Sequence, residues 1–193
     1  MSDVVVEEKD RSVIIRFNRP ELRSPLSIAV LEELSLIIDA IERRTDVERV
    51  IFTGVDDVFA SGADLREIAL VDGDEARDFA RRGQDLMRRI SQMKAATIAA
   101  VNGICFGGAL DLALACGRRI ASHAALFSHP GSSLGIITGW GGTQRLPRLV
   151  GEAIALEMLF TAKRVSADDA LRLGLVDEVV TDPLGSALNF RDV

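Results

Sequence analysis

Hydrophobic residues recur along the chain at two different spacings, and the spacing predicts which segments are helices and which are strands. The clearest helical spacing lies between residues 28 and 44, where apolar side chains fall three and four positions apart: Val30, Leu31, Leu34, Ile37, Ile38 and Ile41. Ser27 precedes this run and is a residue type that caps helix N-termini. We therefore expect an amphipathic helix from Ser27 to about Arg44.

Short apolar runs bounded by turn-forming residues predict the strands. We expect strands at residues 12–17, 50–53, 97–101, 118–122 and 176–180. Further helices are expected between and after them, at residues 74–93, 109–116, 143–150, 152–161 and 166–174. Strands that alternate with helices are typical of an α/β fold with mostly parallel strands. No linker interrupts this pattern, so we expect one domain over residues 1–193.

Two segments depart from the regular pattern. Residues 74–93 are rich in charged side chains and carry only a weak apolar stripe, which predicts a solvated helix. Residues 126–142 are uncharged and rich in glycine, and we expect a loop there. Because loops on a rigid scaffold often hold binding groups, this loop is a candidate part of a functional site.

Composition and charge exclude several classes of protein. Hydrophobic residues make up 48% of the chain, which suits a compact domain with a substantial core. The net charge is −6 and no long basic run exists, so we expect no nucleic-acid partner. The uncharged stretch at residues 95–110 is too short to span a membrane, and the acidic residues 1–10 do not resemble a secretory signal. We therefore expect a cytoplasmic protein with no membrane partner.

Neither the cysteines nor the glycines form a known metal or nucleotide motif. Cys105 and Cys116 belong to no C-x-x-C pair, so they indicate buried free thiols rather than a disulfide or a zinc site. The chain has neither the GK[ST] ending of a phosphate loop nor a G-x-G-x-x-G string after a strand. We expect no metal and no separate cofactor.

Two turns are the best candidates for chemistry. The segments at residues 59–65 and 106–112 each follow a strand, contain glycine and open a helix. The first N–H groups of a helix have no partner within the helix, and its dipole favours negative charge there. Two such helix starts facing one point would form an oxyanion hole. From the residues alone, both segments are equally compatible with plain structural turns.

Four blocks of sequence then point to one family. They are Asn18-Arg19-Pro20-Glu21 with Phe59-Ala60-Ser61-Gly62-Ala63-Asp64-Leu65; Ala100-Val101-Asn102-Gly103 with Gly107-Gly108-Ala109-Leu110-Asp111-Leu112-Ala113; Leu134-Gly135-Ile136-Ile137 with residues 141–151; and residues 166–180. In their order and spacing, from about residue 4 to residue 180, they resemble the crotonase (enoyl-CoA hydratase/isomerase) superfamily.

The resemblance implies a fold, a ligand and an assembly. The fold would be a crotonase-like spiral of repeated ββα units, assembled as homotrimers or hexamers. The ligand would be an acyl-CoA thioester, with coenzyme A as part of the substrate. The oxyanion hole would be formed by the N–H groups of Ala63 and Gly108. Arg23 would meet a phosphate of coenzyme A, although a solvated surface arginine is an equal alternative at that position.

The same resemblance implies a set of residues that contact the substrate. We expect this set to comprise Arg23, Pro25, Ala60, Asp64, Leu65, Ile104, Gly107, Pro130, Gly131, Leu134 and Gly135. Trp140 either walls the acyl pocket or belongs to the core, and the sequence leaves both possibilities open.

The chain departs from the family pattern at both catalytic carboxylates. Hydratases of the family use two glutamates, and the positions that match them hold Asp111 and Gly131. The Asp111 side chain is one methylene shorter, but it still lies one turn inside the predicted oxyanion helix, where it can act as a base or stabilise the helix dipole. Gly131 removes the second acid or base, and His129, two residues upstream, is a candidate replacement because imidazole titrates near neutral pH.

Two classes of function follow. The first is an enoyl-CoA hydratase/isomerase-type enzyme in which Asp111, Ala63, Gly108 and His129 carry the chemistry. Isomerisation fits a single carboxylate better than hydration does, and a decarboxylase or thioesterase would also need mainly the oxyanion hole. The second is a non-catalytic acyl-CoA-binding or scaffold subunit. The resemblance fades after Thr181, so we expect a C-terminally short family member in which residues 182–193 form a tail.

Overall fold

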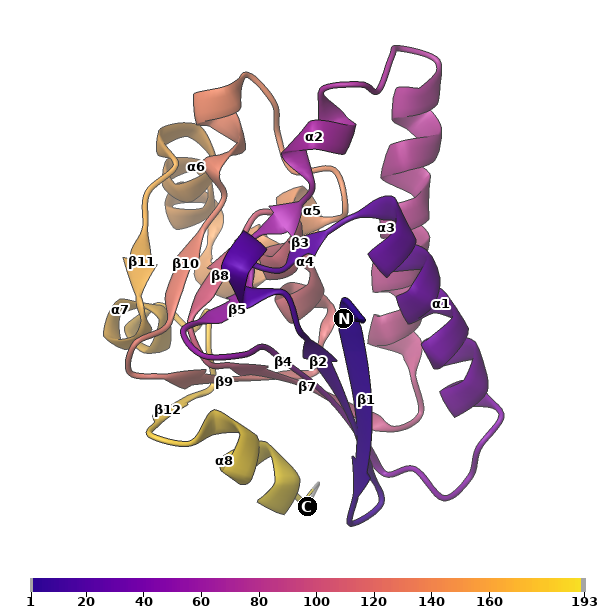
Figure 1. The fold of residues 1–193 in the computed structure, drawn as a ribbon. Coiled ribbons are helices and arrows are strands. Elements are labelled where there is room, and N and C mark those ends of the chain that lie inside the picture. Colours follow the sequence, from indigo (N-terminus) through magenta and orange to yellow (C-terminus); the bar gives the residue numbers. More distant parts are fainter. Residues whose placement is uncertain (1, 192–193) are drawn as a thin grey trace.

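A computed structural model describes residues 2–191 as two stacked sheets wrapped by helices (Figure 1). The larger sheet has the strand order β1-β2-β4-β7-β9-β12. Its strands are β1 (Val4–Lys9), β2 (Ser12–Phe17), β4 (Arg49–Thr53), β7 (Ala96–Val101), β9 (Arg118–Ser122) and β12 (Glu178–Val180). Within residues 2–191, only the β1–β2 pair of this sheet is antiparallel, and its other neighbouring strands run parallel. The central strands are buried on both faces, which explains why they are nearly continuous apolar runs.

The smaller sheet runs in the order β11-β10-β8-β5. Its strands are β11 (Val165–Ser166), β10 (Leu126–Ser128), β8 (Ile104–Phe106) and β5 (Val58–Ala60), and a two-stranded ribbon of β3 (Pro25–Leu26) and β6 (Gly62–Ala63) lies nearby. In chain order, a strand of the large sheet is repeatedly followed by a strand of the small sheet and then by a helix, as in β7-β8-α4. The α/β class and the expected spiral of ββα units are therefore confirmed.

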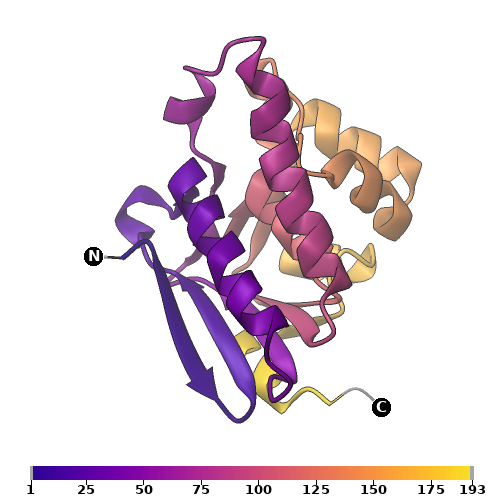
Figure 2. The same ribbon diagram turned by 90° about the vertical axis from the view of Figure 1, so that its right-hand side faces the viewer.

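Helices cover the inner face of the large sheet. The long helices α1 (Ile28–Glu42) and α3 (Glu75–Gln92) lie side by side (Figure 2). The others are α2 (Leu65–Ile68), α4 (Gly108–Ala115), α5 (Gly142–Val150), α6 (Glu152–Thr161), α7 (Ala167–Arg172) and α8 (Pro183–Asn189), with short 3-10 turns η1 (Pro20–Leu22) and η2 (Pro130–Leu134). Every residue of α4 is buried, so this helix is the centre of the molecule.

Most of the predicted elements are present within a few residues of their expected ends. The Ser27 side chain caps α1 by accepting a hydrogen bond from the Val30 N–H at 3.2 Å. Residues 126–142 are not wholly a loop, since they contain β10 and η2. Strand β1 was not expected, because it is a mostly exposed edge strand whose second half is charged. Helix α3 is less solvated than predicted, because it buries Gly83, Leu86, Met87 and Ile90.

The expected C-terminal tail is wrong for the part of it that the structure describes. Residues 183–189 form α8, which packs on the outer face of the large sheet against Ile51, Ile98 and Ile120. The Asp182 side chain caps this helix by accepting from the Gly185 N–H at 2.9 Å. The pattern was too short to indicate a helix from sequence. Residues 192 and 193 lie outside the described part of the chain.

The helices of residues 2–191 include none that combines the length and the apolar character needed to cross a bilayer. The uncharged stretch at residues 95–110 is instead divided among β7, β8 and the start of α4.

Candidate active site

Helix α4 begins at a sharp turn that places a carboxylate at the centre of the molecule. Gly107 adopts φ 53° and ψ −123°, a conformation that side chains strongly disfavour, and its N–H donates to the Ser128 carbonyl at 2.9 Å. Gly108 is the first helical residue, so its N–H has no partner within the helix. Asp111 follows one turn later and is fully buried.

The two turns singled out in the sequence lie against each other. A Cβ atom on Gly62 would lie only 2.7 Å from the Gly108 nitrogen and 2.6 Å from the Phe106 carbonyl oxygen. Glycine at position 62 therefore permits a close approach between β6 and the start of α4, and its φ of 92° also favours glycine. As a result, Ala63 and Gly108 line the same cavity.

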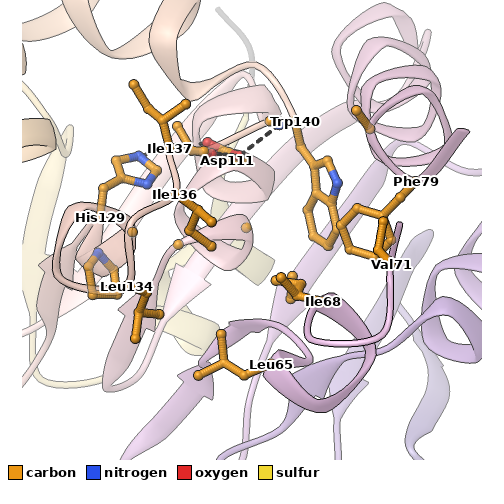
Figure 3. A pocket seen from close by; sticks show the side chains of 18 of the residues that line it. Leu65, Ile68, Val71, Phe79, Asp111, His129, Leu134, Ile136, Ile137 and Trp140 are labelled. Carbon is orange, nitrogen blue, oxygen red and sulfur yellow. Dashed lines mark hydrogen bonds and ion pairs between the residues drawn. The ribbon is translucent and has the colours of Figure 1, made fainter. Parts of the chain in front are cut away.

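This cavity has a volume of about 390 Å³ and is lined mainly by apolar side chains (Figure 3). Its size falls within the range of small-molecule sites. The sequence-predicted site residues that line it are Ala63, Leu65, Gly107, Gly108, Asp111, His129, Pro130, Gly131 and Leu134. The structure thus brings together residues from three separate segments of the chain.

The other predicted site residues do not line the cavity: Arg23, Pro25, Ala60, Asp64, Ile104 and Gly135. Ala60 is fully buried in the core. Asp64 caps α2 by accepting from the Arg66 N–H at 2.9 Å, and it pairs with the Arg66 guanidinium at 2.6 Å. The Arg66 guanidinium lowers the pKa of the Asp64 carboxyl. The Asp64 carboxylate therefore has hydrogen-bond and ion-pair partners within the chain and needs no ligand to satisfy it.

Asp111 is held by the loop that precedes α5. The Thr138 hydroxyl and the Trp140 N–H both donate to Oδ2 of Asp111, the latter at 3.2 Å (Figure 3). Oδ1 accepts no hydrogen bond of normal geometry from the described residues. Burial raises the pKa of Asp111 to about 6, and the Thr138 hydroxyl, the Trp140 and Gly142 N–H groups and the Arg145 charge oppose that rise. A carboxyl with this pKa is suited to proton transfer near neutral pH.

His129 lies beside this carboxyl. Its Nε2 is 3.7 Å from Oδ1 of Asp111, the ring is buried, and neither ring nitrogen has a hydrogen-bond partner among the described residues. Burial lowers the pKa of His129 to about 4, so the ring is neutral at neutral pH. The two groups are therefore a carboxylate beside a neutral imidazole rather than an ion pair.

No second carboxylate faces the cavity among the residues that line it in the described part of the chain. At the position where the family resemblance places a second glutamate, a Cβ atom on Gly131 would lie 2.8 Å from the Ile136 carbonyl oxygen. The Ile136 N–H donates to the Gly131 carbonyl at 3.0 Å, which fixes this close approach. The glycine is therefore part of the packing of this loop.

Apart from Leu65, sequence reasoning missed one wall of the cavity. This wall comes from α2, α3 and the segment between them, and its residues are Ile68, Val71, Ala76, Phe79 and Ala80. The missed residues on the opposite side are Ile136, Ile137, Thr138 and Gly139. Ala76, Phe79 and Ala80 continue the weak apolar stripe of α3, which by itself does not show that the stripe faces a cavity. Ile68, Val71 and residues 136–139 follow no helical or strand period, so the hydrophobic pattern did not distinguish them from loop residues.

Trp140 turns out to be both a wall and a part of the core. It lines the cavity but is only 2% exposed, and its ring contacts Phe79 with 5.8 Å between ring centroids. A Cβ atom on Gly83 would lie 2.2 Å from Cδ1 of Trp140, and one on Gly108 would lie 2.3 Å from Cζ3. The indole is therefore wedged between α3 and α4. The isolated glycine within α3 was the sequence signal for this close approach.

Residues 2–191 contain no cluster of three or more His, Cys, Asp or Glu side chains placed to hold a metal ion. Both cysteines are buried and free. Burial raises the pKa of the Cys116 thiol to about 12, so this thiol is neutral at physiological pH.

Comparison with known proteins gives a consistent result. Residues 7–184 match the family model for enoyl-CoA hydratase/isomerase. The chain is 40% identical over 181 residues to a short-chain-enoyl-CoA hydratase of Clostridium acetobutylicum, covering 93% of this chain and 69% of the relative. It is also 40% identical over 179 residues to a crotonyl-CoA hydratase of Syntrophomonas wolfei, covering 92% and 69%.

Solved structures agree with the sequence relatives. The structure of Pseudomonas aeruginosa DspI superposes with a TM-score of 0.93 at 35% identity, covering 98% of this chain and 78% of that one. An enoyl-CoA hydratase from Bacillus anthracis superposes with a TM-score of 0.88 at 39% identity, covering 93% and 70%.

Proposed function

This chain belongs to the enoyl-CoA hydratase/isomerase family and has the crotonase fold, and from that premise we propose that it acts on enoyl-CoA thioesters by one-carboxylate enolate chemistry. The reaction that fits best is a shift of the double bond between the 3,4 and 2,3 positions. The observation that carries this proposal is that Asp111 is the only carboxylate lining the cavity in the described chain.

In the proposed reaction, the thioester carbonyl oxygen accepts hydrogen bonds from the N–H groups of Ala63 and Gly108. Ionised Asp111 removes a proton from C2 of a 3-enoyl thioester, and the electrons form a dienolate whose negative charge lies on the carbonyl oxygen. The same carboxyl then returns the proton to C4, and the double bond moves to C2–C3. One group serves both steps, so no second acid is needed. Each N–H donor of an oxyanion hole can lower the activation free energy by roughly 3 kcal/mol.

Hydration requires two proton transfers at different atoms, because water must lose a proton as its oxygen adds to C3 while C2 gains a proton. Family hydratases divide this work between two carboxylates, and the matching position here is Gly131. His129 is neutral at neutral pH, so it does not supply a ready imidazolium in place of the missing acid. This argument favours isomerisation over hydration for this chain.

The test is to incubate the protein with a 3-enoyl-CoA in D2O and to follow both the conjugated-thioester absorbance and deuterium at C4. We expect absorbance to appear, with substoichiometric deuterium if Asp111 carries the same proton between carbons. The Asp111→Asn variant should show neither change while still binding the thioester. Rapid loss of absorbance from a 2-enoyl-CoA, with no shift of the 3-enoyl isomer, would overturn the proposal in favour of hydration.

The second candidate is a non-catalytic acyl-CoA-binding protein, which the missing second carboxylate also favours. It predicts thioester binding without turnover of either isomer and no difference in turnover between wild type and Asp111→Asn. The pKa of Asp111, raised to about 6 at the foot of an apolar cavity, favours the enzyme because a binding protein gains nothing from a buried titrating carboxyl.

A further inference from the structure

We propose that Thr138 is a positioning residue that holds the Asp111 carboxylate in one orientation and leaves Oδ1 as the oxygen that transfers the proton. The proposal rests on the proposed function of Asp111 as the single base. It starts from the uneven contacts of the carboxylate, whose Oδ2 accepts from both the Thr138 hydroxyl and the Trp140 N–H. A carboxylate oxygen offers two lone pairs, so these two donors occupy Oδ2.

Oδ1 is the oxygen that these two donors leave unoccupied, and it lies between His129 and the start of α5. It is buried, has no hydrogen-bond partner of normal geometry among the described residues, and belongs to a side chain that lines the cavity. Burying an acceptor without a partner is unfavourable, so such an atom in a folded protein points to a functional reason. A substrate C–H group bound in the cavity needs an acceptor of this kind.

Core packing fixes the loop that carries Thr138. The Trp140 ring is wedged between Gly83 and Gly108, which anchors the backbone two residues after Thr138. At Gly142 a Cβ atom would lie 2.1 Å from Oδ1 of Asp111 and 2.9 Å from Cγ2 of Thr138, so glycine there lets the start of α5 close on both side chains. The Thr138 hydroxyl is therefore directed at Asp111 by the packing of α3, α4 and α5.

The contact also affects the charge state of Asp111. A hydrogen bond to the ionised form lowers the pKa of a carboxyl, and here the Thr138 bond opposes the larger effect of burial. The other titratable groups that face Asp111 are neutral His129, Arg145 on α5 and the buried Cys105 thiol of β8. Removal of the Thr138 hydroxyl should thus raise the pKa of Asp111 and free its carboxylate to rotate.

The experiment compares Thr138→Val, which replaces the hydroxyl by a methyl group, with Thr138→Ser, which keeps the hydroxyl and removes the methyl group, using 3-enoyl-CoA as the probe. We expect kcat of Thr138→Val to fall on the order of 10- to 100-fold with KM little changed, since small displacements of a catalytic group have effects of this size. The pH at which kcat/KM is half-maximal should move upward from about 6 in Thr138→Val, and Thr138→Ser should recover most of both losses. Thr143→Val, which makes the same change on α5 outside the cavity lining, is the matched control.

Two outcomes separate this proposal from the one on which it depends. If Asp111→Asn retains wild-type turnover, the proposed function itself fails. If Asp111→Asn is inactive but Thr138→Val keeps the wild-type kcat, or loses activity with an unchanged pH profile and a lowered Tm, then only the positioning role of Thr138 is overturned.

Discussion

The cavity has two walls that differ in almost every physical respect. The wall formed by α4 and residues 129–142 carries all of its titratable groups, and Asp111, His129 and Trp140 are each at most 2% exposed. The wall formed by α2 and α3 is apolar and open to solvent, with Leu65 54% exposed and no buried residue in α2. The first wall joins the core through Asp111, His129 and Trp140, although its Leu134, Ile136 and Ile137 are exposed, and the second wall lies mainly at the surface.

Under the proposed function, the difference corresponds to a division of labour between the two walls. Groups that move a proton must be held within a fraction of an ångström, and the α4 wall achieves this through glycines that allow close packing and hydrogen bonds to one carboxylate oxygen. The α2–α3 wall needs only to bury an acyl chain and exclude water, which requires no directional contacts. We therefore expect substitutions in the first wall to affect kcat or stability, and those in the second to affect KM.

The largest effect is expected for Asp111→Asn. If Asp111 is the only base, turnover of 3-enoyl-CoA should fall by at least about 1,000-fold, a loss within the range of a general base together with its positioning. The measurement is single-turnover isomerisation with thioester binding checked by calorimetry. Asp111→Glu is the matched variant that keeps the charge, and it should retain more activity than Asp111→Asn.

The same substitution should stabilise the fold at neutral pH. Burial raises the pKa of Asp111 from 3.8 to about 6, so the folded protein keeps a proton that the unfolded chain has released, and stability falls as pH rises through this window. The ionised carboxylate thus costs on the order of 3 kcal/mol above pH 6. Asp111→Asn should raise the Tm at pH 7.5 and have little effect at pH 4, where Asp111 is already protonated in the folded protein. An equal change at both pH values would contradict this assignment.

The second largest effect is expected for Gly83→Ala on α3. Helix propensity alone predicts a gain of about 1 kcal/mol, because glycine is a poor helix former. The packing predicts the opposite sign, since the new Cβ would lie 2.2 Å from Trp140, and overpacking of this kind typically costs about 1–3 kcal/mol. Chemical denaturation measures the sign directly. In a Trp140→Leu background the clash is relieved, and there Gly83→Ala should become neutral or stabilising.

The two walls were also unequally predictable from sequence. Segments with a clear period were located well, because α1 and the strands β2, β4, β7 and β9 bury one continuous face or both faces. Asp111, Ala63 and Gly108 line one cavity, and the sequence singled them out because they lie in or one turn after the glycine-containing turns that follow such strands.

The less predictable parts of the fold and of the site depend on contacts between residues that are distant in the sequence. Thr138 is 27 residues from Asp111, and nothing in its local pattern indicates a hydrogen bond to that carboxylate. The α2–α3 wall shows only the weak apolar stripe of α3 and no period in residues 65–71, and α8 is stabilised by the outer face of the sheet rather than by its own seven residues. Tertiary packing decides such segments, so the sequence pattern alone leaves them open.

A comparable effect on stability is expected when a carboxylate is placed at position 131. Gly131→Glu restores the residue type that the family hydratases use, but its Cβ would press on the Ile136 carbonyl at 2.8 Å. We expect a loss of stability of about 1–3 kcal/mol and no gain of hydration of a 2-enoyl-CoA. Gly131→Ala is the control that adds the Cβ without the charge, and it should lose a similar amount of stability. A stable Gly131→Glu variant that hydrates crotonyl-CoA would show that the α4 wall tolerates a second acid.

The smallest effect is expected in the α2–α3 wall. Leu65→Ala removes apolar surface that lines the cavity but is already half exposed, so stability should change by less than about 0.5 kcal/mol. The KM for an enoyl-CoA should rise about three- to fivefold with kcat unchanged. Each buried CH2 contributes roughly 0.8 kcal/mol to binding, which corresponds to a change of about fourfold. Leu70→Ala, at a residue that is 83% exposed and outside the cavity lining, should change neither constant. A fall in kcat for Leu65→Ala would show that this wall also positions the reacting atoms, and the division between the two walls would then be lost.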